Sequence, residues 1–300
     1  MIKVLLTNTN KAYLPEVEAY KDFFNNQTEY FFFDSAELGM YDIKDYDMIW
    51  SFMGFDREKH DRIRIHDYAS LSTGNFAHIK DFIKKNMNKK PALRLFLNQY
   101  VKQGFGFKDG APSVMRDMGI SESFFSDFSP KKEYDFVYVG AINKSRRTDK
   151  LLAKFKNEYK NQTLLVIGHV EKEWMDTFRA PNIIFAGRLN YKEVAQTAKL
   201  AHYGINYIPN KYPYNLQTST KLLEYLAMGL NVVTNEYQWI KDFEKSKNIN
   251  LFKMDENLNI DFKKLETFHF KSCDMKDFMW KNVLLNSGMK EALDKLISGN

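Results

Sequence analysis

The sequence predicts an α/β protein of two domains, each built on a parallel sheet with helices between its strands. Strand-like and helical runs alternate along the first half, and the same alternation restarts in the second half. A polar stretch that contains proline, residues 126–133, separates the two series and is typical of a linker. Strands that alternate with helices need crossover connections between parallel strands. We therefore expect two domains, residues 1–130 and 131–300.

In the first half, short runs rich in β-branched and aromatic residues predict strands, and longer runs predict helices. The expected strands are IKVLLT, EYFFFD, YDMIWSFM, RIRIH and ALRLFLN. The expected helices cover 15–24 and 75–90, and Pro15 suits the first turn of the former.

In the second half, the expected strands are FVYVG, TLLVIG, NIIFAG, YGINYIP and NVVT, with helices over 147–159, 191–201 and 220–228. The first three strands end at Gly140, Gly168 and Gly187. Ligands of open parallel sheets lie beyond the carboxyl ends of the strands, where glycine lets a backbone come close. Glycine is also an ordinary strand terminator, so the pattern indicates a ligand edge without proving one. The GxGxxG and GxxxxGK[ST] phosphate motifs are absent.

The composition excludes several classes of protein. With 44% hydrophobic residues, 300 residues can bury large cores. The single cysteine, Cys273, excludes an internal disulfide framework and suits a reducing compartment. Neither a signal peptide nor a run near the ~18 apolar residues of a membrane span is evident, so we expect a cytoplasmic protein. The net charge of +6 suits a nucleotide, a membrane surface or a nucleic acid alike.

Four segments of the second half occur in the order and spacing of a known family: FVYVGAINKSRRTDKLLAKF, TLLVIGHV, PNIIFAGRLNYKEVAQTAKLAHYGINYIPN and STKLLEYLAMGLNVVTNE. They resemble the donor domain of GT-B glycosyltransferases, above all the large retaining family four that uses nucleotide-sugar donors. The resemblance implies two Rossmann-like domains that face each other across a cleft. It also implies that a C-terminal helix, at about 274–298 and bearing Trp280, returns to the first domain.

The last of these segments combines a polar start with a lysine and one acid inside an apolar helix. A helix that begins at Thr218, Ser219 and Thr220 offers unpaired N–H groups and a positive dipole end to a phosphate. Lys221 in the first turn opposes the helix dipole, which a bound diphosphate would explain. The resemblance implies that Glu224 holds the nucleotide ribose. The alternative is a capped surface helix in which Lys221 and Glu224 form an i,i+3 pair.

A basic loop follows the first glycine-ended strand. The resemblance places Arg146 at the donor diphosphate, with Arg147 beside it, and a guanidinium can bind phosphate oxygens in a bidentate manner. A solvated loop of basic residues is the alternative. The loops that would border the nucleobase follow Gly168 and Gly187 and include His169 and Arg188.

The segment RIRIHDYAS in the first half resembles the family's strand that ends in histidine and aspartate. On that resemblance His66 reaches the donor sugar, and a neutral imidazole can donate to a hydroxyl; a structural histidine is the alternative. Two features depart from the family: Leu216 replaces a second acid that contacts the donor sugar, and TNTNKAY replaces a Gly-Gly loop. Asp67 and Asp56 therefore remain possible general bases of an inverting reaction.

The expected activity is transfer of a sugar from a nucleoside-diphosphate sugar to a glycan or lipid-linked glycan in cell-surface polysaccharide synthesis. We expect the nucleoside to be uridine. We favour retention over inversion. Arg146, Lys221 and the helix N-terminus would stabilise the leaving diphosphate without a metal or another cofactor. Alternatives are an epimerase or phosphorylase of the same fold and a non-catalytic nucleotide-sugar-binding subunit. Nucleic-acid binding ranks last, because the basic residues are dispersed.

The helix expected at 75–90 carries Phe76, Ile79, Phe82 and Ile83 at the spacing of one face. An ordinary amphipathic helix packs such a face into the core. Its many lysines and single acid nevertheless suggest peripheral binding to the inner face of the membrane, where each lysine near an anionic leaflet contributes about 1 kcal/mol. The lysines concerned are Lys80, Lys84, Lys85, Lys89 and Lys90.

Overall fold

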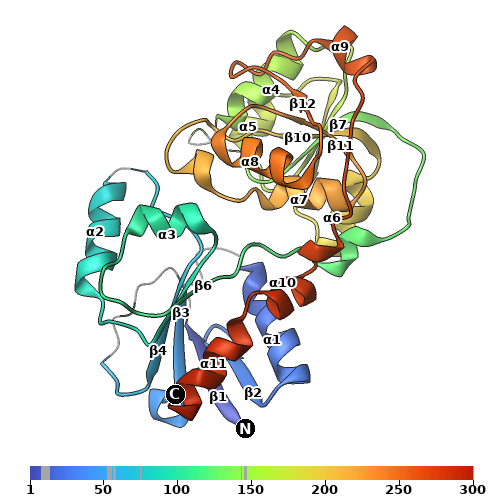
Figure 1. The fold of residues 1–300 in the computed structure, drawn as a ribbon. Coiled ribbons are helices and arrows are strands. Elements are labelled where there is room, and N and C mark those ends of the chain that lie inside the picture. Colours follow the sequence, from blue (N-terminus) through green and yellow to red (C-terminus); the bar gives the residue numbers. More distant parts are fainter. Residues whose placement is uncertain are drawn as a thin grey trace. The chain divides into compact units, whose positions relative to one another are not determined.

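The computed structural model describes residues 1–7, 14–52, 56, 59–74, 76–142, 144 and 147–299 (Figure 1). The chain divides into two compact units: unit 1 is Met1–Gly119 with Phe278–Asn300, and unit 2 is Ile120–Asp277. Each unit contains a six-stranded sheet with helices packed against it. The predicted α/β fold with two parallel-sheet domains is thus confirmed.

The sheet of unit 1 is parallel throughout. Its strands, in spatial order, are β2 (Tyr30–Asp34), β1 (Ile2–Thr7), β3 (Met48–Phe52), β4 (Ile63–Tyr68), β5 (Leu93–Phe96) and β6 (Ser113–Met115). Its helices are α1 (Pro15–Gln27), α2 (Ala77–Met87), α3 (Gln99–Phe105), α10 (Trp280–Asn286), α11 (Met289–Ser298) and the short 3-10 turn η1 (Ile43–Asp45).

One face of this sheet is covered by α1 and by the C-terminal helices, which lie side by side in Figure 1. Proline occupies the start of α1, and Tyr20 and Phe24 on its inner side pack against Trp50 of β3 and its neighbours. Gly119 lies against the indole of Trp280, and a Cβ there would come within 2.2 Å of the ring. Only glycine therefore lets the returning helix α10 pack this closely.

The sheet of unit 2 is also parallel. Its strands, in spatial order, are β12 (Phe252–Lys253), β11 (Asn231–Thr234), β10 (Ala201–Asn206), β7 (Tyr134–Val139), β8 (Leu164–Ile167) and β9 (Ile183–Gly187). Its helices are α4 (Thr148–Asn157), α5 (Lys172–Thr177), α6 (Tyr191–Ala198), α7 (Thr220–Ala227), α8 (Gln238–Lys247) and α9 (Phe262–Glu266), with 3-10 turns η2 (Glu122–Phe125) and η4 (Tyr214–Leu216).

The structure divides the chain at Gly119, earlier than the 130/131 boundary drawn from composition. The reason is packing. Phe124 of η2 is buried against Tyr191 of α6, with ring centroids 5.5 Å apart, and Lys199 donates to the Ser126 carbonyl. The segment that precedes the polar stretch therefore belongs to the core of unit 2.

None of the helices within the described ranges is long and apolar enough to cross a bilayer.

Candidate functional site

The strand order of unit 2 reverses between β7 and β10. From β7 the chain continues to β8 and β9 on one side, then returns to place β10, β11 and β12 on the other. In open parallel sheets, ligands bind outside the carboxyl ends of the strands at such a switch point. A ligand site is therefore expected at the start of α7 and at the loops that begin at Gly140 and at Tyr207.

The three glycines that end β7, β8 and β9 all have positive φ: 137° at Gly140, 142° at Gly168 and 75° at Gly187. A Cβ on Gly168 would lie 2.4 Å from the carbonyl oxygen of Gly140, and the Gly168 N–H donates to the Gly187 carbonyl at 2.8 Å. Close packing of these loop backbones thus requires glycine at 168 whether or not a ligand binds. Around Gly187, no described atom lies within 4 Å of a Cβ position.

The N-terminus of α7 is held by a buried hydrogen-bond network. Ser219 is the N-cap: its Oγ accepts from the Leu222 N–H at 3.4 Å and donates to Asn206 Oδ1 at 2.8 Å. Asn206 in turn donates to Thr234 Oγ1 and the Tyr237 hydroxyl. The Ser219 hydroxyl is therefore occupied within the protein. The same end of α7 carries the positive end of the helix dipole.

Lys221 extends from this first turn to the end of β7. Its Nζ lies 3.7 Å from the centroid of the Tyr138 ring, and a Cβ on Gly140 would lie 3.6 Å from the same nitrogen. The ring face attracts the ammonium and holds it beside the glycine loop. The structure thus brings Lys221 and Gly140 together, as the sequence pattern predicts.

Glu224 lies one turn further along α7 and is only 9% exposed. Burial raises the pKa of its carboxyl to about 8, and Lys221 acts in the opposite direction. No described residue donates a hydrogen bond to this carboxyl group. The interpretation of α7 as a surface helix is therefore wrong, because residues 222–226 are all buried.

The basic residues of the neighbouring loops have different surroundings. Arg147 is the N-cap of α4, with φ of 57°. Burial raises the pKa of Tyr207, which follows β10, and the positive charge of the nearby Arg147 acts in the opposite direction. Thr218 is buried, Thr220 is half-buried, and Arg188 is exposed after β9. Arg146, which the resemblance places at the diphosphate, lies outside the described residues.

His66 of unit 1 is an interior residue of β4. Its side chain is 1% exposed, and burial with the nearby Arg94 and Arg64 lowers its pKa to about 3, so the ring is neutral. Its Nε2 lies 3.7 Å from Asp56 Oδ2 and makes no hydrogen bond with any described residue. This placement favours the structural alternative over contact with a sugar.

Asp67 and Asp56, the two candidate bases, are both internal. Successive side chains of a strand point to opposite faces, so Asp67 faces α1 while His66 faces the other way. The two carboxylate oxygens of Asp67 accept hydrogen bonds from Arg116 Nε at 2.9 Å and from the Tyr20 hydroxyl at 3.0 Å. The Asp56 carboxylate is 2% exposed and ion-paired to Arg64. Neither carboxylate is placed to take a proton from an acceptor, which corrects that expectation.

Unit 1 has its own switch point between β1 and β3, but residues 8–13 and 53–55, which follow those strands, lie outside the described part of the chain. They include most of the TNTNKAY loop.

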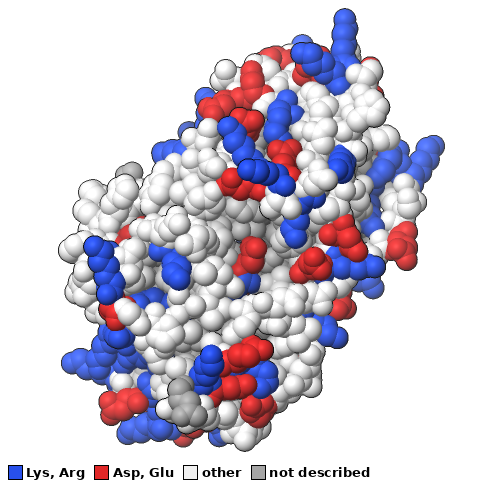
Figure 2. Space-filling model, viewed as in Figure 1, with Lys and Arg blue, Asp and Glu red and all other residues white. Residues whose placement is uncertain are grey.

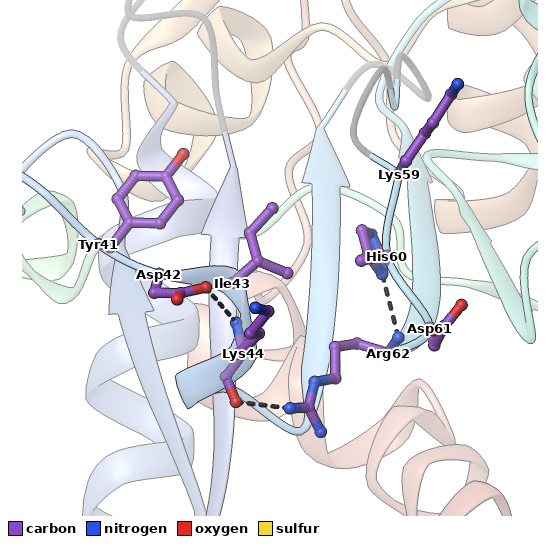
Figure 3. Close-up of a pocket in the computed structure, with 8 residues that line it drawn as sticks. All are labelled: Tyr41, Asp42, Ile43, Lys44, Lys59, His60, Asp61 and Arg62. Atoms are coloured by element: carbon purple, nitrogen blue, oxygen red, sulfur yellow. Dashed lines mark hydrogen bonds between the residues drawn. The ribbon is translucent and has the colours of Figure 1, made fainter.

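A pocket of about 1030 Å³ lies near the segments that precede β3 and β4 (Figure 3). There the Arg62 guanidinium donates to the Lys44 carbonyl at 2.6 Å. This pocket is not at a carboxyl edge, where ligands of such sheets usually bind.

Among the described residues, no group of three or more His, Cys, Asp or Glu side chains has an arrangement that could hold a metal ion.

Sequence comparisons find neither a matching family model nor a matching curated protein. Solved structures do match. HepE of Anabaena, solved in complex with UDP-glucose, has a TM-score of 0.65 at 11% identity and covers 99% of this chain and 100% of its own. AviGT4, a glycosyltransferase involved in avilamycin A biosynthesis, has a TM-score of 0.63 at 13% identity, with 100% and 99% covered.

A third similar structure is sucrose-phosphate synthase of Thermosynechococcus elongatus, with a TM-score of 0.64 at 13% identity over 85% of this chain and 75% of that one. At such low identity these likenesses establish the fold. The chain has the GT-B fold of glycosyltransferases, the architecture that the sequence resemblance implied.

Proposed function

We propose that this protein transfers a sugar from a uridine-diphosphate sugar to a hydroxyl group of a glycan or lipid-linked glycan in cell-surface polysaccharide synthesis. The observation that carries the proposal is the buried Glu224 carboxyl, without a described donor, beside Lys221 at the switch point of unit 2. A buried acid without a hydrogen-bonding partner is costly, and a ligand that supplies donors offsets that cost. The neighbour HepE, solved with UDP and with UDP-glucose, supports this choice of donor.

In the proposed complex the vicinal hydroxyls of the ribose donate to Glu224. The diphosphate lies at the N-terminus of α7, where the helix dipole and the Lys221 ammonium are both electropositive. Arg146 would add a bidentate contact, and the loop at Gly187 and Arg188 would border the base. As the glycosidic bond breaks, negative charge grows on the diphosphate, and these fixed groups stabilise it without a metal ion.

Retention of anomeric configuration is the outcome we propose. Inversion needs an accessible base, and both carboxylates considered for that role are engaged in buried contacts. Leu216 of η4 is half-buried at the position where the family carries an acid, and its side chain supplies no base. NMR of the product formed from an α-linked donor distinguishes the two: an α-product supports retention, and a β-product contradicts it.

The experiment that tests the activity is a UDP-release assay with a panel of UDP-sugars, ADP-glucose and GDP-mannose against glycan and lipid-linked acceptors. Wild type should release UDP with at least one UDP-sugar, and Lys221→Met should lower kcat because leaving-group charge peaks in the transition state. Lys245→Met, an exposed lysine of α8, is the matched control and should turn over normally. Donor isomerisation without transfer would favour the epimerase alternative, and tight binding without turnover would favour a binding subunit.

The location we propose is the cytoplasm, with the acceptor presented at the inner face of the membrane. Under this proposal an anionic lipid surface attracts the lysines of α2 and of the residues just after it. These lysines are Lys80, Lys84, Lys85, Lys89 and Lys90. On the face drawn in Figure 2, basic and acidic side chains are interspersed, which gives no support to a nucleic-acid partner.

A further inference from the structure

Helix α2 packs on unit 1 with its apolar side outward. No residue of α2 is buried. Four large apolar side chains are strongly exposed: Phe76 at 73%, Ile79 at 54%, Phe82 at 65% and Met87 at 76%. The expectation that this amphipathic helix packs its apolar face into the core is therefore wrong.

The half-buried residues of α2 include two that make polar contacts with the rest of unit 1, Asp81 and Lys84. The Asp81 carboxylate accepts from the Ser72 N–H at 3.0 and 3.2 Å. Lys84 lies over the Phe105 ring of α3, with Nζ 6.0 Å from the centroid, and burial lowers its pKa. At 100° per residue, positions 81 and 84 lie on the side of the helix opposite to Ile79 and Phe82. These contacts anchor α2 in the inverted orientation.

Lysines border the exposed apolar side chains. Lys80 and Lys85 are exposed and lie on either side of the Ile79–Phe82 face, and Lys89 and Lys90 are exposed just beyond the end of the helix. The one acid of residues 76–90, Asp81, is turned inward and occupied. In Figure 2, the edge of the molecule where Figure 1 draws α2 is largely uncharged surface with basic side chains near it.

We infer that α2 is a membrane-docking helix whose four exposed apolar side chains, Phe76, Ile79, Phe82 and Met87, insert between the headgroups of an anionic bilayer. A helix that lies in a bilayer interface has an apolar face flanked by basic residues, with the lysines at the lipid phosphates. An acidic protein partner would also attract the lysines. A helix with four exposed apolar side chains and no outward acid matches the extended, uniformly anionic surface of a bilayer better.

The insertion of α2 rests on the membrane part of the proposed function, for which electrostatic attraction of the lysines would be enough. Insertion of apolar side chains adds a contribution to membrane binding that high salt does not remove. It is independent of the donor site, which lies on unit 2, so vesicle binding and UDP binding can each fail without the other.

The test is flotation of the full-length protein with vesicles of phosphatidylcholine alone or mixed with phosphatidylglycerol. Wild type should bind the mixed vesicles, and the double variant Ile79→Ser, Phe82→Ser should bind them about tenfold more weakly. Leu285→Ser removes a side chain of α10 that is 52% exposed and should bind as wild type does. Because all three positions are exposed, thermal melts and UDP binding should be unchanged.

A charge variant separates insertion from simple attraction. Lys85→Gln, Lys89→Gln, Lys90→Gln should lose binding mainly at low salt, whereas the serine variant should lose it at all salt concentrations. If wild type ignores anionic vesicles at low salt, the inference fails. It also fails if the serine variant binds as wild type does, since only attraction by lysines then remains, or if light scattering shows that the apolar face joins two copies of the chain.

Discussion

Replacing Glu224 by glutamine should change how the stability of the protein depends on pH. Glutamine has the same shape but cannot ionise. In the unfolded chain the glutamate titrates near 4.5, and burial raises its pKa in the folded chain to about 8. Between these values the folded protein retains a proton that the unfolded chain has released. The free energy of unfolding of wild type should therefore fall as pH rises from 4.5 to 8, and the loss should level off above 8.

The magnitude follows from the two pKa values. They differ by about 3.5, and each pKa unit corresponds to about 1.36 kcal/mol, so the loss across this window is on the order of 5 kcal/mol. The glutamine variant lacks this loss. Its amide needs partners of its own, which costs about 1–3 kcal/mol, but this cost is the same at every pH. The variant should therefore gain stability relative to wild type as pH rises, whatever its stability at pH 5.

Urea unfolding at pH 5 and pH 9, followed by circular dichroism, measures this difference. Glu173→Gln, which changes an exposed acid of α5, is the control and should show the pH dependence of wild type. Only Glu224→Gln should depart from the wild-type pH dependence, by several kcal/mol between the two pH values. An equal pH dependence in all three proteins would mean that Glu224 titrates like an ordinary surface acid, and the burial argument would be refuted.

Two further predictions concern packing. Gly168→Ala should destabilise the protein by at least about 2 kcal/mol, because its Cβ would approach the Gly140 carbonyl oxygen to 2.4 Å at a φ of 142°. Gly187→Ala has no described atom within 4 Å of its Cβ and should cost less. Equal melting temperatures for the two variants would contradict this reasoning. Arg116→Met should cost about 3–5 kcal/mol because it leaves the buried Asp67 carboxylate unpaired; a urea midpoint equal to that of wild type would show that the buried network is not needed.

The edge of unit 2 that carries the three glycines was largely predictable from the sequence, because parallel alternation puts the carboxyl ends of all strands on one side. That rule brings Gly140, Gly168 and Gly187 together and places Lys221 next to them. It could not predict Tyr138 under the Lys221 ammonium or Asn206 behind Ser219. Such contacts depend on which strands become neighbours, and only the fold determines that.

Two expectations about unit 1 failed for reasons that periodicity alone does not address. The spacing of apolar residues in α2 shows which side chains share a face, but not which face meets the protein. In the structure the Lys84 ammonium lies over the Phe105 ring and Asp81 accepts from the backbone, and these contacts turn the apolar face outward. The alternation of β4 does put His66 and Asp67 on opposite faces. Applied to RIRIHDY, that rule would have shown that the two side chains cannot line one site.

The central claim is that the α7 end of unit 2 binds a uridine diphosphate, and calorimetric titration of UDP tests it most directly. Wild type should bind, and Lys221→Ala and Glu224→Ala should each bind about tenfold or more weakly, because a hydrogen bond to a charged group contributes about 1.5–3 kcal/mol. Lys245→Ala should match wild type. At pH 7, binding should also release a proton as the buried Glu224 ionises, which makes the heat depend on the buffer. Absence of UDP binding in wild type, or unchanged affinity in both α7 variants, would contradict the account.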